Sequence, residues 1–332
     1  MIDLTKGKIL VTGGAGFIGS ALVWALNLKG IDDILVSDFL GTDEKWRNLV
    51  PLRFDDFIPP DKLLDRIEES PNSLDDIQAV FHLGACSATT ERDLGYLMRN
   101  NFEFTKILGE WSARRKIRFT YASSAATYGD GSAGMKDDET ILDKLRPLNG
   151  YAFSKQRFDL YAARRGLLSQ FVGLKYFNVF GPNEGHKGDM RSVVHKAFQQ
   201  VQSTGKIQLF KSYHPDFRDG EQKRDFLYVK DAVEMTIFLA ADPSAAGIFN
   251  LGFGRARSWI DLANAVFSAV GKPPVIEFIE MPEALRPNYQ NFTEANIDKL
   301  LGLGFKGPKF PLEEAVRDYV QHYLALGKPL EP

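Results

Sequence analysis

The chain has 332 residues, of which 44% are hydrophobic and 25% are charged, as is usual for globular proteins. Its 41 basic and 43 acidic side chains give a net charge of −2. No overall positive field therefore favours nucleic acid or an anionic membrane as a partner. At roughly 150 residues per domain, the length suggests two domains, or one large domain with an appendage.

The cysteine content and the N-terminus indicate the compartment. A single cysteine, Cys86, cannot form an internal disulfide, so nothing points to an oxidising environment. Residues 1–8 are polar and show no signal-peptide arrangement. No uncharged apolar run approaches the 18 residues of a membrane span. We therefore expect a cytoplasmic protein without membrane or nucleic-acid partners.

The first half of the chain alternates short apolar runs with helical patterns. Strands are predicted at residues 9–11, 34–36, 79–81, 119–121 and 171–174, and helices at 17–28, 97–115 and 153–165. Strands that alternate with helices imply crossover connections and a parallel sheet covered on both faces. The predicted fold class is α/β, a doubly wound parallel sheet of the Rossmann type.

The sequence changes character after about residue 178. Glycine and proline cluster at 181–188, and a polar stretch covers 211–224. Helical patterns recur at 193–201, 232–240, 260–270 and 312–324. We predict a dinucleotide-binding domain over 1–178 and a smaller, interleaved domain over 179–332 that mainly binds substrate. The boundary is approximate, because later segments can return to the first domain.

A glycine-rich segment follows the first strand and opens the first helix. Gly14, Gly16 and Gly19 form the pattern G-x-G-x-x-G, with Gly13 just before it. Glycines let the backbone turn tightly and approach a pyrophosphate, which then lies at the helix N-terminus. Asp38 ends the second strand, 19 residues after Gly19, where a carboxylate can accept hydrogen bonds from the adenine ribose. The sequence therefore predicts a dinucleotide site.

The residues leave the choice between NAD and NADP open. Asp38 favours a free 2′-hydroxyl, as in NAD. Lys45 and Arg47 lie just beyond it, in a loop that can reach the 2′-phosphate of NADP.

Three further side chains suggest acid/base chemistry. Tyr151 and Lys155 are four residues apart and share one face of the predicted helix. An ammonium near a phenol stabilises phenolate, so we expect the pKa of Tyr151 to fall below its reference value of ~10. Ser124 follows a strand and is expected in the crevice where open α/β sheets bind ligands. It can hydrogen-bond the reacting oxygen there.

These motifs together resemble the extended short-chain dehydrogenase/reductase superfamily nearly end to end. In that superfamily serine, tyrosine and lysine form the hydride-transfer triad, which the resemblance assigns to Ser124, Tyr151 and Lys155. Segments 82–91, 175–190 and 223–229 narrow the resemblance to the ADP-L-glycero-D-manno-heptose 6-epimerase family.

The most specific element of this narrower resemblance is His-Lys-Gly at 186–188. The chain departs from the family at Phe39 and Leu83, where asparagine and glutamate are frequent. Its stretch 211–222 is also longer than in the enteric members. These departures bear on the cofactor preference and the diphosphate contacts.

The resemblance implies a redox epimerisation. ADP-D-glycero-D-manno-heptose would be oxidised at C6 and re-reduced to the L-glycero epimer, a step in making the inner core of lipopolysaccharide. The implied cofactor is NADP, with NAD as the alternative, and no metal is expected. We expect ADP-heptose as the substrate and a homo-oligomer as the assembly, of a size that the sequence does not give.

Two acid/base groups are expected, because the two epimers present their hydroxyls in different directions to one nicotinamide face. We assign Tyr151 to one epimer and Lys187 to the other. Lys155 would orient the nicotinamide ribose, and Ser124 would hold the carbonyl oxygen.

The resemblance also implies binding residues. Those expected at the cofactor are Gly13, Gly16, Phe17, Ile18, Gly19, Asp38, Phe39, Lys45, Leu83, Gly84, Ala85, Cys86, Ser87, Asn100, Tyr151, Lys155, Val179 and Lys187. Those expected at the substrate are Asn178, Asp189, His195, Lys196, Phe210, Lys211, Ser212, Tyr213, Arg224 and Tyr289. The planar fork of Arg224 suits a diphosphate. His195 stays open between substrate contact and core packing.

Other functions compete on the same scaffold. A UDP-hexose 4-epimerase would share the triad but would give Lys187 no role. A sugar 4,6-dehydratase would need an Asp-Glu pair after the serine, where Ala125 and Ala126 stand. A protein that senses dinucleotide without chemistry is a third alternative, against which the intact Ser124, Tyr151 and Lys155 argue.

Overall fold

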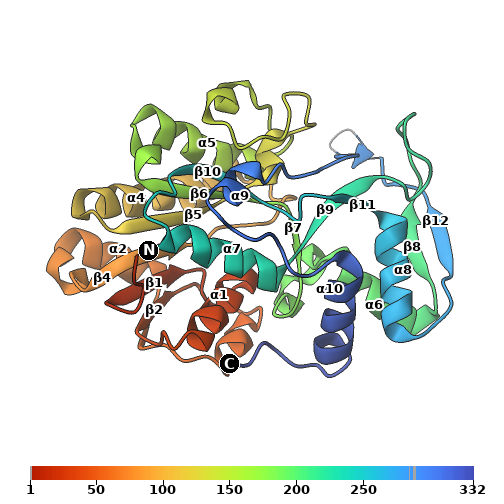
Figure 1. Cartoon of the computed structure of the whole chain (residues 1–332), viewed down its shortest axis with the longest axis horizontal. Coiled ribbons are helices and arrows are strands. Elements are labelled where there is room, and N and C mark those ends of the chain that lie inside the picture. The colour runs from red at the N-terminus through yellow and green to blue at the C-terminus, as the bar shows by residue number, and fades with distance from the viewer. Residues whose placement is uncertain (1, 284, 287–288) are drawn as a thin grey trace.

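A computed structural model describes residues 2–283, 285–286 and 289–332 of the chain. Its central layer is a seven-stranded sheet in the order β10-β6-β5-β4-β1-β2-β3 (Figure 1). The strands are β1 (Lys8–Thr12), β2 (Ile34–Ser37), β3 (Asp56–Ile58), β4 (Ile77–His82), β5 (Arg118–Ser124), β6 (Phe171–Tyr176) and β10 (Gly247–Leu251). Every neighbouring pair is parallel, which confirms the predicted doubly wound parallel sheet.

Helices cover both faces of this sheet. One face packs against α1 (Phe17–Leu28) and α7 (Val229–Ala241). The other packs against α2 (Pro60–Glu69), α4 (Phe104–Arg115) and α5 (Gly150–Arg164). In β1, for example, Ile9 and Val11 join the first cluster and Leu10 the second. Strands buried on both sides need apolar side chains at consecutive positions, which is why they appear as short apolar runs.

The strands and helices predicted in the first half are present, with one helix divided. The predicted helix at 97–115 consists of α3 (Leu94–Leu97), a π-helical turn at Met98–Glu103, and α4. Asn101 lies buried within the π turn, and its amide bonds to the backbone of Cys86. Such single turns commonly occur at functional sites, and here the turn places Asn101 against the loop that follows β4.

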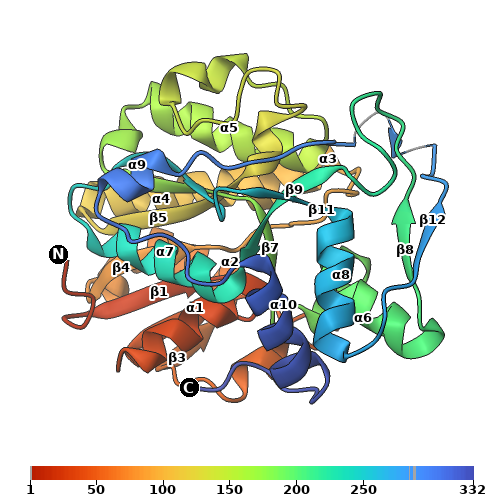
Figure 2. The same ribbon diagram turned by 45° about the vertical axis from the view of Figure 1, so that its right-hand side comes forward.

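The second half builds two smaller sheets beside the main one. The strands β7 (Asn178–Phe180), β9 (Lys223–Tyr228) and β11 (Ala256–Ser258) form a mixed sheet, and β8 (Ile207–Phe210) pairs with β12 (Ile276–Ile279). The helices α6 (Val193–Thr204), α8 (Trp259–Val270) and α10 (Leu312–Tyr319) pack beside them, as Figure 2 shows. The short helix α9 (Asp298–Gly302) lies against β10.

The two halves are interleaved in space. The boundary predicted at residue 178 falls at the first residue of β7. Both α7 and β10 come from the second half, yet α7 covers the main sheet and β10 forms its edge beside β6. No helix of the described residues is long and apolar enough to cross a membrane.

Parallel pairing places the carboxyl ends of all seven strands at one edge. The loops that follow β1, β4, β5 and β6 therefore meet there, where ligands bind in open α/β sheets. The loops after β1 and β4 carry the glycine-rich segment and Cys86, Ser124 ends β5, and Lys187 lies in the loop after β7, the short strand that follows β6.

We predict that Gly173→Ala lowers the free energy of unfolding by about 1–3 kcal/mol, because it overpacks the sheet. A methyl group at Gly173 would lie 2.5 Å from the Tyr121 hydroxyl and 2.6 Å from Ile248 Cδ1. Urea unfolding of both proteins measures the change. Gly302→Ala is the matched control, because an added Cβ there meets no atom within 4 Å. Equal unfolding free energies for Gly173→Ala and the parent protein would contradict this packing.

Candidate active site

The loop after β1 is shaped for close approach of a ligand. Gly13 has φ +69° and lies against the next loop, so that a Cβ would come within 2.6 Å of Gly84 N. A Cβ on Gly19 would overlap the carbonyl oxygen of Gly13. A Cβ on Gly16, in contrast, would meet only that oxygen, at 3.1 Å. Gly16 thus leaves open space directly before α1, whose first-turn N–H groups lack intrahelical acceptors. This open space between Gly16 and the first turn of α1, which we call the cradle, fits a pyrophosphate.

The cradle opens into a cavity of about 390 Å³ at the sheet edge. Its lining residues are Gly13, Gly16, Phe17, Ile18, Gly19, Asp38, Asp43, Lys45, Leu83, Gly84, Ala85, Cys86, Ser87, Ala88, Ala122, Tyr176, His186, Lys187 and Met190. Most residues predicted at the cofactor are among them. Phe39, Asn100, Tyr151, Lys155 and Val179 are not: Phe39 is 56% exposed, and Asn100 donates to the carbonyl of Tyr96.

Asp38 lies at the end of β2, on the wall of this cavity. One carboxylate oxygen accepts from Ala15 N at 3.0 Å, and the other lies 3.0 Å from Lys45 Nζ. Arg47, the second cation noted in the sequence, is turned away: it pairs with Glu44 and stacks on Trp46. The cavity therefore carries an Asp38–Lys45 pair at the position where the adenine ribose is expected.

A buried histidine that the sequence did not single out ties β1 to β4. His82 Nδ1 lies 2.6 Å from Thr12 Oγ1, and His82 Nε2 lies 2.8 Å from Thr105 Oγ1. Thr12 Oγ1 also accepts from Gly84 N at 3.2 Å. Burial lowers the pKa of His82 to about 3, so the ring stays neutral. It holds the two loops of the cradle together.

Ser124 and Tyr151 meet beside the cavity. Tyr151 stands at the start of α5, where Asn149 caps the helix by accepting from Ala152 N. The Ser124 hydroxyl lies near the Tyr151 phenol. Burial raises the pKa of Tyr151, and the nearby Ser124 hydroxyl opposes the rise. The direction is opposite to the one predicted from the Tyr151–Lys155 spacing, because desolvation outweighs the other influences.

Lys155 completes the predicted triad from the same helix. Its ammonium donates to the Ala122 carbonyl at 2.9 Å, next to the cavity wall. Burial lowers the pKa of Lys155 to about 8, while Asp159 and Cys86 act in the opposite direction. The pKa values of both Tyr151 and Lys155 respond to Cys86, which lines the cavity.

Lys187 reaches the same cavity from the loop after β7. Its ammonium lies 5.3 Å from the ring centroid of Phe17, the first residue of α1. Burial lowers the pKa of Lys187, and the nearby Glu184 partly offsets that change. Glu184 itself is buried and accepts from Ser192. A second candidate acid/base group thus lies at the cofactor cavity.

The predicted substrate residues divide into two groups, and the first lies around the loop before α6. Asn178 is exposed at the start of β7, and Lys196 donates to the backbone oxygen of Asp189 at 2.6 Å. His195 faces a different cavity, of about 950 Å³, between this loop and the C-terminal segment. Burial lowers the pKa of His195 to about 4.

The second group lies around β8 and β9. Arg224 is only 6% exposed, and its guanidinium lies 5.4 Å from the Trp259 ring centroid and 5.0 Å from that of Tyr289. Its guanidinium donates to the Lys223 carbonyl at 2.9 Å, and it makes no ion pair with a described carboxylate. Arg224 is therefore a buried cation that lies beside two aromatic rings and has no counter-charge among the described residues.

The remaining predicted substrate residues follow β8 on an exposed strand end. Lys211 pairs with Glu280 at 2.6 Å, and the Arg286 guanidinium lies 3.8 Å from the Tyr213 ring centroid. Ser212 N donates to Asp219 at 2.7 Å. Phe210 ends the strand and is partly buried.

Sequence reasoning missed several residues of the site. Asn101, the neighbour of the predicted Asn100, is buried and hydrogen-bonds the backbone of Cys86. Asp43 and His186 line the cavity through loops that have no periodic pattern. One signal in the sequence pointed to the hydrogen bonds of His82 behind the cradle: a polar residue in an apolar strand.

Comparison with known proteins identifies the family of the chain. Residues 9–252 match the NAD dependent epimerase/dehydratase family. A curated relative from Nitratidesulfovibrio vulgaris (strain DP4), named ADP-L-glycero-D-manno-heptose-6-epimerase, is 52% identical over 320 residues, which cover 96% of this chain and 99% of the relative.

Solved structures show the same fold. The Helicobacter pylori ADP-L-glycero-D-manno-heptose-6-epimerase superposes with a TM-score of 0.80 at 26% identity, covering 97% of each chain. The Thermus thermophilus UDP-glucose 4-epimerase in complex with NAD gives a TM-score of 0.74 at 26% identity, covering 96% of this chain and 99% of that one. The chain belongs to the NAD dependent epimerase/dehydratase family and, within it, to the ADP-L-glycero-D-manno-heptose-6-epimerases.

Proposed function

We propose that this protein converts ADP-D-glycero-D-manno-heptose to ADP-L-glycero-D-manno-heptose, for the inner core of lipopolysaccharide. The observation that carries the proposal is the position of Lys187. It brings a second ionisable group to the cavity that Cys86 lines beside Tyr151. An epimerase that inverts an exocyclic carbon needs acid/base groups in two directions, and these two side chains come from separate elements.

The chemistry is a reversible oxidation at one carbon. A bound nicotinamide dinucleotide supplies a hydride acceptor and donor at a fixed face. C6 of the heptose loses a hydride and its hydroxyl loses a proton, which leaves a ketone. The ketone then presents its other face, takes back the hydride at C6 and takes a proton at oxygen. The net result is inversion at C6.

Side chains of the protein remove the proton from the C6 hydroxyl and return it. Ser124, which lies near Tyr151, would hold the reacting oxygen. Tyr151 exchanges the proton for one epimer and Lys187 for the other. Burial raises the pKa of Tyr151, which favours the protonated phenol as the acid. Burial lowers the pKa of Lys187, which favours the neutral amine as the base. Lys155 supplies a positive charge on the Tyr151 helix.

Arg224 supports a diphosphate in the substrate. Its guanidinium is buried between two aromatic rings and pairs with no described carboxylate, although buried charges are costly when uncompensated. An anionic group would supply the missing counter-charge, and a planar fork matches phosphate oxygens. We assign the ADP diphosphate to Arg224, with Tyr289 and Asn178 on the substrate side.

We further propose NADP as the cofactor, with Lys45 as the cation for its 2′-phosphate. Lys45 lines the cavity, and its ammonium already lies beside the Asp38 carboxylate. Asp38 alone would favour NAD, so Lys45 decides the preference in this assignment.

Replacing Tyr151 by phenylalanine should slow epimerisation by about 10²–10⁴-fold, because the phenolic acid/base is lost. The conversion is followed by resolving the two C6 epimers of ADP-heptose. Dinucleotide binding should persist, since Asp38 and the glycine loop are unchanged. Turnover close to that of the parent protein in both directions would remove Tyr151 from the chemistry.

Lys187→Met should cripple epimerisation to a similar extent while cofactor binding and the folded state persist. Tyr151 would still serve one epimer, so a half-reaction should survive with substrate analogues. Lys206→Met, in the turn after α6, is the control lysine and should behave as the parent. Normal epimerisation by Lys187→Met would make Lys187 a loop residue and would favour a one-base enzyme such as a UDP-hexose 4-epimerase.

Lys45→Met should weaken NADP binding by about tenfold to a hundredfold and leave NAD binding nearly unchanged, because one charge-assisted phosphate contact is worth about 1.5–3 kcal/mol. Titration of both dinucleotides by calorimetry measures this. Arg47→Met should change neither affinity, since Arg47 is turned toward Glu44. An equal loss for both dinucleotides would show that Lys45 does not read the 2′-phosphate.

A further inference from the structure

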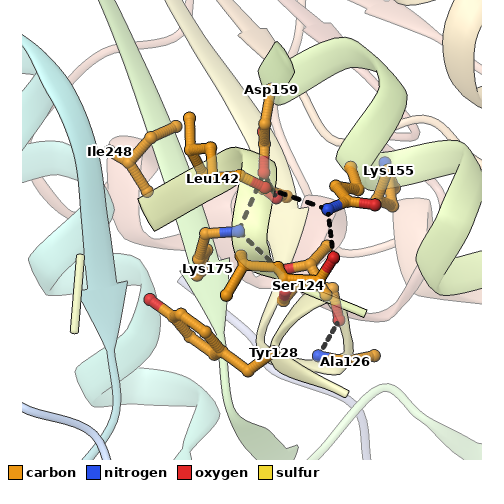
Figure 3. Close-up of polar contacts among 12 residues, drawn as sticks. Ser124, Ala126, Tyr128, Leu142, Lys155, Asp159, Lys175 and Ile248 are labelled. Atoms are coloured by element: carbon orange, nitrogen blue, oxygen red, sulfur yellow. Dashed lines mark hydrogen bonds and ion pairs between the residues drawn. The ribbon is translucent and has the colours of Figure 1, made fainter. Parts of the chain in front are cut away.

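A buried ion pair lies directly behind the Ser124–Tyr151 site. Lys175 of β6 and Asp159 of α5 are 1% and 0% exposed at their side chains, and Lys175 Nζ lies 2.8 Å from Asp159 Oδ2. Figure 3 shows the two side chains pointing toward one another between helix and sheet. Burying such a pair is costly unless further hydrogen bonds satisfy it. The pair is therefore a poor choice for stability alone.

Both members of the ion pair form hydrogen bonds to β5, the strand that ends at Ser124, or to the turn that follows it. Asp159 accepts from Ser123 Oγ at 2.7 Å and from Tyr121 Oη at 3.0 Å. The ammonium of Lys175 donates to Thr127 Oγ1 at 2.5 Å, and Thr127 Oγ1 donates in turn to the Ser124 carbonyl at 2.7 Å. This chain of bonds fixes the turn in which Ser124 Oγ accepts from Ala126 N (Figure 3).

The pair also acts on the helix that carries Tyr151 and Lys155. Asp159 follows Lys155 by one helical turn and Tyr151 by two, so the three residues lie along one side of α5. Its carboxylate raises the pKa of Lys155, against the larger effect of burial. The other ionisable groups that face Lys155 are Cys86 and His82, and His82 is neutral.

We propose that the Asp159–Lys175 pair is a positioning device for the reaction: it holds the Ser124 turn through Thr127 and keeps a negative charge behind Lys155. Neither residue contacts the cofactor cavity, so both act through others. The inference rests on the proposed function, since it assumes that Ser124, Tyr151 and Lys155 carry the chemistry.

The decisive variant is the double substitution Asp159→Asn with Lys175→Met. It removes both charges, so no lone buried charge destabilises the fold. We expect kcat for epimerisation to fall by about tenfold to a hundredfold, with KM within about threefold of the parent value. We also expect the alkaline limb of the pH profile to move about one pH unit lower. The sign follows because Asp159 raises the pKa of Lys155, whereas Lys175 is not among the charges that act on it, so removal of the pair lets Lys155 lose its proton at lower pH.

Two single variants separate the two roles. Thr127→Val keeps the ion pair but breaks its link to the Ser124 carbonyl, so kcat should fall while the alkaline limb stays in place. Lys175→Arg keeps a cation beside Asp159, so the limb should again stay in place. The control is Asp143→Asn with Arg164→Met, an exposed ion pair at the end of the same helix, which should leave kcat and the pH profile unchanged.

The inference is overturned if the Asp159/Lys175 double variant has the parent's kcat and alkaline limb. If that variant does not fold, Thr127→Val decides, and an unchanged kcat overturns the inference. Tyr151→Phe separates this inference from the proposed function. If it keeps full turnover, the proposed function itself fails. If it is inactive while the double variant is normal, only the positioning role fails.

Discussion

The site depends on the contact between the backbones of Gly13 and Gly84. These residues begin the loops after β1 and β4, and no side chain fits between them. Thr12 and the neutral His82 hold the two strand ends at that distance, in part through a hydrogen bond from Gly84 N to Thr12 Oγ1. The open space at Gly16 and the cavity wall formed by residues 83–88 both follow from this approach.

The same contact is linked to the catalytic helix. Asn101 bonds to the backbone of Cys86 on both sides and donates to Ser154 Oγ at 3.0 Å, and Ser154 Oγ donates to the Tyr151 carbonyl at 2.7 Å. Cofactor loop, π turn and Tyr151 thus form one hydrogen-bonded unit. On the far side of α5, Asp159 and Lys175 tie the helix to β5 and β6. The backbone position of Tyr151 is therefore held by two networks, the hydrogen bonds of Asn101 and Ser154 and the Asp159–Lys175 pair.

How far the sequence predicts this arrangement differs between elements. Glycine spacing and apolar runs depend on local geometry, so α1 and the strands of the first half follow directly from them. The return of β10 to the main sheet is a long-range pairing with β6, which no local pattern specifies. The π turn at Met98–Glu103 interrupts the helix predicted at 97–115, and helical periodicity does not show this interruption. The direction of the Tyr151 pKa was mispredicted because burial, which is invisible in a spacing, is its largest cause.

The proposed reaction requires that C6 is oxidised and then receives its own hydrogen back. ADP-D-glycero-D-manno-heptose carrying deuterium at C6, incubated with the purified protein and its bound dinucleotide in ordinary water, tests this by mass spectrometry of the product. We expect an L-glycero product that keeps the deuterium at C6. Loss of that deuterium to solvent would mean removal of a C6 proton instead, and it would contradict the roles given to the dinucleotide cavity, Tyr151 and Lys187.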